Sequence, residues 1–368
     1  MTLLVILVCW LDKRLTLDNG KSVKQGLVSS VARYSVWILY WWFQSLTICG
    51  IWLIGHECVH GSFSPYPALN DFVGFILHSS LGTPYYSWKY SHHHHHTYNG
   101  HLDKDEHFIP GVFEAHDSDN NTSFWDCIED TPIYQTVKLM LYQLFGFQLY
   151  LLFNASGQPR YPRWTSHFNR ELTHFPNSGY SSHKQSSANS IIFGRSQRMH
   201  VVLSDIGIFV ALSSLIYTIY ATQMTLGLAI RLCGVPWLLL NHWIVMIVTL
   251  HHTDVLLPRY RKGAFTFSRG ALVTVDRNFL GWQGKFFLHE VSHFHVVHHF
   301  FPSIPFYNLE EATQYAKKEL GSDYHSCDTP VFRALWENSL RCRFIDAEGD
   351  IVFFKDRLGN TRYRSAVE

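Results

Sequence analysis

The sequence predicts an all-α integral membrane protein with about four membrane helices, the first truncated or missing, and a helical cap that carries metal-binding histidines. Two observations support this fold class. Of the 368 residues, 47% are hydrophobic, and many of them are gathered in long apolar runs. The 24 histidines are the compositional outlier, and histidine is the commonest metal ligand among side chains.

The membrane spans are predicted from length and polarity, because a bilayer crossing needs about 20 mostly apolar residues. Three runs meet this requirement with a single charged residue each: residues 31–55, 201–221 and 225–250. An apolar run at residues 69–82 is too short to cross. Residues 133–153 are long enough but include Lys138, Gln143 and Gln148. We expect these last two runs to lie at the membrane interface.

The remaining segments fall outside the predicted spans. Residues 3–11 are apolar but short, and we interpret them as the remnant of a first membrane helix or as a sign that the true N-terminus lies upstream. Residues 154–190 predict a polar loop, residues 309–320 an amphipathic helix, and residues 343–355 a hairpin. The predicted organisation is an N-terminal segment 1–30, a membrane domain 31–320 and a C-terminal tail 321–368.

Charge and cysteine usage narrow the function classes. The formal net charge is +1, which gives no indication of a nucleic-acid partner. The seven cysteines are scattered and form no C-x-x-C pair. The sequence therefore predicts neither a disulfide framework nor a cysteine zinc site.

The histidines form three clusters, at residues 56–60, 92–96 and 295–299. On a helix, residues at i, i+3 and i+4 share one face, so each cluster can direct two or three imidazoles the same way. The convergent residues are His56, His60, His92, His95, His96, His295, His298 and His299. One metal ion binds about four to six protein or water ligands. Eight imidazoles are too many for one ion and suit two.

Topology provides an independent test of this two-metal hypothesis. The clusters can meet only if they lie on one side of the membrane. The runs at 201–221 and 225–250 make two crossings between the second and third clusters, and two crossings return the chain to its starting side. The hypothesis therefore requires that residues 69–82 and 133–153 do not span.

A zinc protease is one alternative. His56-Glu57-x-x-His60 matches the H-E-x-x-H pattern, in which the two histidines bind zinc and the glutamate acts as general base. This function would use three residues and leave the other two histidine clusters without a role.

Two further alternatives also use metal ligands. The Glu-x-x-His pattern of carboxylate di-iron bundles begins at Glu57, Glu171 and Glu290, but that fold needs four facing helices, and Glu171 falls in the polar loop. A metal transporter would place ionisable groups inside its spans. Here the histidines lie mostly outside the predicted spans, with His242 as the exception, which argues against transport.

At this level of detail the chain resembles the membrane acyl-lipid desaturases of the oleate Δ12 (ω6) type. The similarity extends from about Tyr40 to the tail and goes well beyond the histidines. It rests on residues 48–64 (ICGIWLIGHECVHGSFS), 88–110 (WKYSHHHHHTYNGHLDKDEHFIP), 153–159 (FNASGQP), 252–254, 269–271, 275–277 and 295–313 (HVVHHFFPSIPFYNLEEAT).

The resemblance implies a specific enzyme. It implies two iron ions held by the eight clustered histidines, O2 as co-substrate, and electrons from cytochrome b5 and its reductase. It also implies a lipid acyl substrate and a multi-pass protein of the endoplasmic reticulum membrane, with the histidine clusters and the tail in the cytosol. By analogy with the wider desaturase group, His252 is a ninth metal ligand. The carboxylates expected to orient ligands are Glu57, Asp103, Asp105, Glu106, Asp254 and Asp276.

The sequence also departs from the family pattern. The departures are Gly61, His93, His94, His251 and His293, which stand where the family usually has other residues. The same scaffold, with small changes near the irons, supports hydroxylation, epoxidation, acetylenic-bond formation or conjugation. These sister reactions on an acyl chain are the alternatives to simple desaturation.

Overall fold

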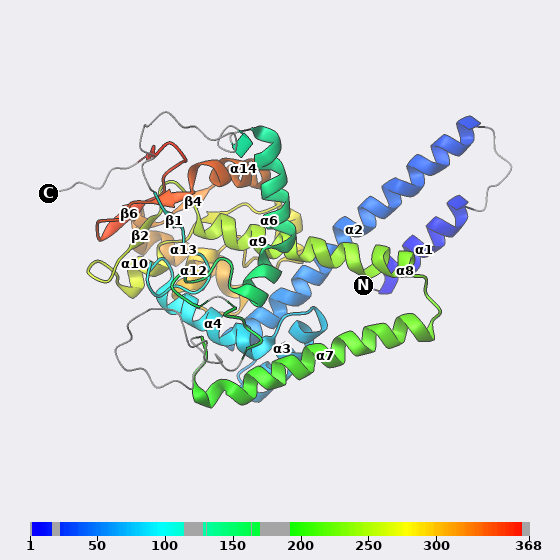
Figure 1. Cartoon of the computed structure of the whole chain (residues 1–368), viewed down its shortest axis with the longest axis horizontal. Helices are drawn as coiled ribbons and strands as arrows, with labels where there is room; N and C mark the ends of the chain where they lie inside the picture. The colour runs from blue at the N-terminus through cyan, green and yellow to red at the C-terminus, as the bar shows by residue number, and fades with distance from the viewer. Residues whose placement is uncertain are drawn as a thin grey trace.

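The computed structural model describes residues 2–16, 23–113, 128–129, 131–162, 164–169 and 192–362. Most of the predicted polar loop at 154–190, including Glu171, lies outside these residues. Within them the fold is mainly helical, so the prediction of an all-α membrane fold is confirmed. The cap elements gather at one end of the molecule, and α1 (Thr2–Thr16) lies beside the far half of α2 (Val23–His60) at the other (Figure 1).

Four helical stretches among the described residues are long and apolar enough to cross a membrane. They are Leu27–His60, Pro132–Phe153, Arg195–Ala221 and Leu226–His252. Three of them contain the runs predicted as spans. The first is the longer part of α2, the third includes α7 (Arg198–Ala221), and the fourth comprises α8 (Leu226–Ala229), a π turn (Ile230–Gly234) and α9 (Val235–His252). Helix α1, at 15 residues, is shorter than a span requires.

The π turn is stabilised by side chains of α2. A π turn widens the backbone and is usually a single turn within an α-helix. Tyr40 donates a hydrogen bond to the carbonyl of Leu232 at 2.8 Å, and the indole of Trp41 donates to the carbonyl of Arg231 at 2.9 Å. In a lipid environment every backbone polar group needs a protein partner, so these two bonds support an irregular turn within a predicted span.

Two helices correspond to the runs expected at the interface. Helix α3 (Pro67–Ser80) has 14 residues and is too short to cross. Helix α6 (Pro132–Phe153) starts at the cap residue Thr131, which accepts a hydrogen bond from the amide of Tyr134, and ends at the left-handed Asn154. It packs against α9 and runs across the direction of α7, α8 and α9 (Figure 1). That crosswise course agrees with an interfacial position, which stays a prediction.

The cap is built from short helices and two-residue or three-residue strands. After α4 (Tyr85–Tyr98) come α10 (Phe267–Ala271), α11 (Trp282–Phe287), α12 (His295–Phe300), α13 (Leu309–Leu320) and α14 (Val331–Arg341). Short 3₁₀ turns lie at Arg195–Gln197, Phe306–Asn308 and Gly321–Asp323. Helix α13 has the bounds expected of the amphipathic helix, and its first turn is acidic while its last is basic, which complements the helix dipole.

The strands pair over long sequence separations. Strand β1 (Gly111–Val112) pairs in parallel with β5 (Phe344–Ile345), β2 (Pro258–Tyr260) pairs antiparallel with β6 (Ile351–Phe353), and β3 (Asp276–Arg277) pairs in parallel with β4 (Ser326–Cys327). The hairpin predicted at 343–355 is present only as an antiparallel bridge between Phe344 and Lys355. Its two strands instead take their main partners from earlier parts of the chain.

The main hydrophobic core lies between α2, α6, α9 and α14. Leu46, Trp52, Phe147, Trp243 and Leu335 are all buried there. The indole of Trp243 donates to the hydroxyl of Ser45 at 2.9 Å, which fixes α9 against α2. This packing brings the end of α2 and the end of α9, both rich in histidine, to the same face of the cap.

Candidate metal centre

Four elements bring the predicted ligands to one place. The last turn of α2 carries His56 and His60, and α2 is long enough to project beyond a bilayer, since 38 residues at 1.5 Å each extend about 57 Å. Helix α9 ends at His252. The other ligands come from α4 (His92, His95, His96) and α12 (His295, His298, His299).

The imidazoles separate into two groups. In the five-histidine group, ligand atoms of His56, His60, His92, His96 and His298 all lie within 4.8 Å of one another. Ligand atoms of His95, His252 and His299 form a second set within the same distance. His295 adjoins that set, because its Nε2 lies 3.2 Å from Nε2 of His252 and its ring centroid 4.8 Å from that of His299. We call these four residues the four-histidine group.

The two groups are adjacent but separate. The rings of His96 and His299 stack at 4.0 Å between centroids with an interplanar angle of 5°, and each belongs to a different group. Parallel stacked rings direct their in-plane lone pairs along parallel planes, so two such rings do not converge on one ion. The stacking therefore supports two neighbouring metal positions rather than one.

The chemical state of the imidazoles fits metal binding. Both ring nitrogens of His96, His298 and His299 are buried with no hydrogen-bond partner. Such orphaned polar atoms are costly unless a ligand satisfies them. Burial lowers the pKa of all three imidazoles well below its ordinary value. They are therefore neutral at physiological pH, which leaves the lone pair that a metal requires.

One of the expected carboxylates, outside the two groups, accepts a hydrogen bond from a histidine within them. The carboxylate of Asp105 accepts a hydrogen bond from Nδ1 of His95 at 2.8 Å. This bond fixes the ring orientation of His95 and leaves Nε2 for a metal. Asp276 accepts from the amide of Val296 at 2.8 Å and so holds the first turn of α12.

The other four expected carboxylates make different contacts. Glu57 accepts from the hydroxyl of Ser62, and its carboxylate lies 3.4 Å from Nδ1 of His56. Glu106 accepts from Tyr161 and Asp254 pairs with Arg277, while Asp103 is exposed. Apart from this approach of Glu57 to His56, none of the four accepts a hydrogen bond from an imidazole of either group within the described part of the chain, and Glu57, Glu106 and Asp254 instead bind residues of the surrounding fold.

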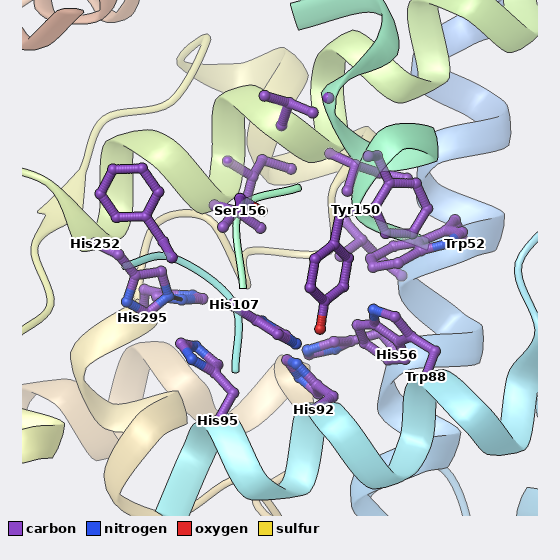
Figure 2. A pocket seen from close by; sticks show the side chains of 18 of the residues that line it. Trp52, His56, Trp88, His92, His95, His107, Tyr150, Ser156, His252 and His295 are labelled. Carbon is purple, nitrogen blue, oxygen red and sulfur yellow. Dashed lines mark hydrogen bonds between the residues drawn. The ribbon is translucent and has the colours of Figure 1, made fainter. Parts of the chain in front are cut away.

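An apolar pocket reaches the histidines from between α2, α4, α6 and α9. Its walls include Trp52, Phe147, Ile244 and Val245, and it ends at His56, His92, His95, His252 and His295. Figure 2 shows these imidazoles facing the pocket, with Trp52 and Tyr150 beside them. The mostly apolar pocket therefore reaches histidines of both groups.

Comparison with known proteins identifies the family. The model of the fatty acid desaturase family matches residues 35–330. The Delta(12) fatty acid desaturase of Mortierella alpina is 40% identical over 338 residues, which cover 88% of this chain and 78% of that protein. The chain belongs to the fatty acid desaturase family. Family membership makes it a membrane oxidoreductase, and its two histidine groups are compatible with a metal site.

Relatives with sister activities are nearly as similar to this desaturase. The oleoyl-12-hydroxylase of Ricinus communis is 37% identical over 323 residues, covering 87% of this chain and 76% of that protein. A Delta(12) acyl-lipid conjugase of Impatiens balsamina is 36% identical over 318 residues, covering 86% and 75%. The family is thus shown, while identity at this level does not by itself distinguish desaturation from its sister reactions.

The rival metal sites are not supported by the geometry of this desaturase. His56 and His60 share their group with three further histidines from α4 and α12, whereas a zinc protease would leave those histidines without a role. Among the described residues, neither histidine group contains a carboxylate. Glu57 and Glu290 therefore do not form a carboxylate di-iron site.

The histidines that depart from the family pattern lie outside both groups. His93 bonds the carbonyl of Val59 at 2.8 Å, and the side chain of His94 is 43% exposed. His251 bonds the carbonyl of Val275 at 2.7 Å, and His293 is buried without a partner on either nitrogen. These four histidines therefore surround the two groups and do not belong to either set of convergent ligand atoms.

One residue of the site was missed by the sequence analysis. His107 is buried, lines the pocket and stacks on His95 with ring centroids 4.2 Å apart. It follows the second cluster by eleven positions and belongs to no i, i+3, i+4 set. Its proximity to Asp105, already singled out as an orienting carboxylate, was the available signal.

Proposed function

We propose that this desaturase is a di-iron Δ12 acyl-lipid desaturase that converts an oleoyl chain to a linoleoyl chain by introducing a cis double bond. The observation that carries the proposal is the apolar pocket that ends at two adjacent groups of imidazoles. The similarity to Delta(12) desaturases over most of the chain supports the position of the new double bond.

Iron fits the ligand set. The nine imidazoles are His56, His60, His92, His96 and His298 for one ion, and His95, His252, His295 and His299 for the other. Imidazole suits iron, and neither group contains a thiolate that an oxidising reaction would consume. With O2 and two external electrons, a pair of irons supplies the oxidising power that an unactivated methylene group requires.

The chain itself holds the substrate and excludes water. The apolar side chains of Trp52, Phe147 and Ile244 bury an acyl chain along α2, α6 and α9. The pocket holds the reacting carbons in a fixed position and orientation beside the imidazole groups. Binding and orientation are the main contributions that a protein makes to a cofactor reaction. Asp105 holds the His95 ring, so the end of the pocket keeps its shape.

The proposed cellular setting is the one that the family resemblance implies. The two metal groups lie at the end of α2 and α9 that meets the cap, and we propose that this cap faces the cytosol from the endoplasmic reticulum membrane. Cytochrome b5 and its reductase would supply the electrons there. The topology requires α3 and α6 to remain at the interface, which the length of α3 and the course of α6 support.

A lipid profile tests the proposal. The chain is expressed in a eukaryotic microbial host that makes oleate but no polyunsaturated lipid, and its fatty acids are analysed by gas chromatography and mass spectrometry with location of double bonds. We expect a new dienoic acid that is absent from His298→Ala. The matched control is His94→Ala, since His94 comes from the same histidine run as the ligands but is exposed and outside both groups.

Each alternative has its own result. A hydroxy, epoxy, acetylenic or conjugated product would retain the metal centre and replace desaturation by a sister reaction. A dienoic acid with a double bond elsewhere would reject the Δ12 assignment. Equal products from the parent and His298→Ala would overturn the metal centre itself.

A further inference from the structure

The inner end of the acyl pocket contains an imidazole that the proposed reaction does not use. His107 is 7% exposed and comes from the segment that follows α4. It lies among the rings of Trp88, His92 and His95, with its centroid 5.3 Å from that of His92. Figure 2 shows it in the middle of the site, between the metal-binding histidines and Tyr150.

His107 is not placed to join either metal group. Its ring is parallel to that of His95, with an interplanar angle of 14° at 4.2 Å, and it is parallel to His92 within 20°. Stacked rings cannot direct their in-plane lone pairs at the same ion. His107 also falls outside both sets of convergent ligand atoms. Its role must therefore concern the pocket rather than the metals.

The imidazole of His107 needs a partner that the chain does not supply. Its Nε2 is buried and has no hydrogen-bond partner. A neutral imidazole offers one N–H donor and one lone pair. A buried polar nitrogen is unfavourable unless a bound molecule satisfies it. A plain hydrocarbon chain has no group that can do so.

A second polar group lies beside it. The ring of Tyr150 on α6 meets that of His107 edge to face, at 5.3 Å between centroids and an angle of 76°. Figure 2 shows the Tyr150 hydroxyl directed toward His107 and His92. Away from the histidines, the pocket wall is made mostly of apolar side chains such as Trp52, Phe147 and Ile244. Two polar groups from different elements thus meet at the depth where the reacting carbons would lie.

We propose that His107 and Tyr150 form a polar subsite that hydrogen-bonds a hydroxyl group within the acyl chain, so that this desaturase accepts monohydroxylated acyl chains in preference to unsubstituted ones. The proposal rests on the proposed function insofar as the pocket holds an acyl chain. The hydroxyl would accept from or donate to Nε2 of His107, and the phenol of Tyr150 would complete its hydrogen bonding. The substrate class is therefore a hydroxyacyl lipid.

The reaction on such a chain is balanced in the same way as on a plain one. Two C–H bonds on adjacent carbons break, a carbon–carbon double bond forms, and the hydroxyl is retained. One O2 is reduced to two molecules of water, which takes four electrons and four protons. The acyl chain supplies two electrons and two protons. An external one-electron donor protein supplies the other two electrons, and solvent supplies the other two protons. His107 and Tyr150 act as positioning residues in this scheme, because they hold the hydroxyl and not the reacting atoms.

Binding without turnover tests the subsite. The purified full chain in lipid nanodiscs is kept anaerobic, and the dissociation constants of methyl oleate and of a series of monohydroxylated methyl oleates are measured by equilibrium binding. We expect at least one hydroxylated ester to bind about tenfold more tightly than methyl oleate, the size of one net hydrogen bond. His107→Leu should reduce this ratio to about one, and His107→Gln, which keeps a donor and an acceptor, should retain part of it.

The control and the contrary outcomes are defined by the same assay. Ile244→Val changes the shape of the pocket without changing its polarity, and it should weaken both esters equally. Equal affinities for the plain and every hydroxylated ester in the parent protein would overturn the proposal and assign the His107 nitrogen to water. A loss of iron in His107→Leu would also overturn it, because His107 would then be a ligand.

Product analysis during turnover then distinguishes a failure of the subsite from a failure of the proposed function. Cells that express the parent chain or His107→Leu are fed both kinds of fatty acid, and the products are analysed by mass spectrometry. We expect the ratio of hydroxydienoic to dienoic product to fall about tenfold in His107→Leu. Failure of the Δ12 assignment would change the position of the new double bond but not the binding ratio. An unchanged product ratio would reject the subsite whatever the regiochemistry.

Discussion

The two histidine groups use the same side chain but are held in different ways. In the five-histidine group, Nδ1 of His92, His96 and His298 has no hydrogen-bond partner, and Trp88 stacks on His92 at 4.1 Å. In the four-histidine group, Asp105 accepts from His95 at 2.8 Å. The carbonyl of Val291 also bonds Nδ1 of His295 at 3.3 Å.

The difference reflects where the ligands come from. The five-histidine group is assembled from residues on α2, α4 and α12, whose packing and aromatic neighbours orient the rings. Two members of the four-histidine group, His95 and His295, depend instead on residues beside α4 and α12 that accept their hydrogen bonds, whereas Nδ1 of His252 and of His299 has no partner. Loss of a helix contact should therefore affect the first group, while loss of a single loop hydrogen bond should affect the second.

Removing one ligand from each group should have the largest effect and should show two ions. We expect His298→Ala and His252→Ala each to lower desaturase activity more than about 100-fold, beyond the loss typical of an outer hydrogen-bond partner. Each should lower the iron content by about one ion per chain, measured by mass spectrometry on purified protein. His94→Ala should keep both. Full iron content in His252→Ala would remove His252 from the ligand set.

The next largest effect should come from the loop carboxylate of the four-histidine group. Asp105→Asn weakens the acceptor that orients His95, and we expect activity to fall about 10-fold to 100-fold. In iron-57 Mössbauer spectra, one of the two iron signals should change and the other should not. Asp103→Asn is the matched control, because Asp103 is an exposed carboxylate two residues away. A change in both signals would mean that the groups are not held independently.

A smaller effect is expected from the aromatic support of the five-histidine group. Trp88→Phe reduces the surface stacked on His92, and aromatic pairs contribute about 0.5–1.5 kcal/mol. We expect activity to fall about two-fold to ten-fold. The Mössbauer signal that changes should be the one that Asp105→Asn leaves unchanged. Trp282→Phe, at a tryptophan that is 67% exposed, is the control. If both substitutions act on the same iron, the proposed contrast between the groups is wrong.

The parts of the fold that depend on local spacing could be predicted from the sequence. The long apolar runs and the helix at 309–320 are set by neighbouring residues, and the i, i+3, i+4 spacing placed eight histidines on helix faces. His252 required the family resemblance, since a single histidine at a helix end has no spacing signal. The structure brings it within 3.2 Å of His295.

The parts that were missed depend on partners far away in the sequence. Residues 343–355 alternate as a hairpin should, but their backbone groups pair with β1 and β2, about 90 or more residues earlier. His107 enters the site because Asp105 folds its segment back against α4, where it bonds both His95 and the amide of His107. Such contacts are set by tertiary packing, which local patterns do not encode.

The smallest effect should arise where no metal is involved, at the π turn between α8 and α9 that Tyr40 of α2 contacts. Tyr40→Phe removes the hydrogen bond to the carbonyl of Leu232 and leaves the ring in place. Hydrogen bonds between membrane helices contribute roughly 0.6 kcal/mol on average, so thermal unfolding in nanodiscs should occur at a slightly lower temperature. Iron content and both Mössbauer signals should be unchanged, because the turn lies at residues 230–234, five turns of α9 before His252. A loss of iron from the four-histidine group would instead show that the π turn sets the position of His252 along α9, and that the bond from Tyr40 helps to align the metal centre across the span.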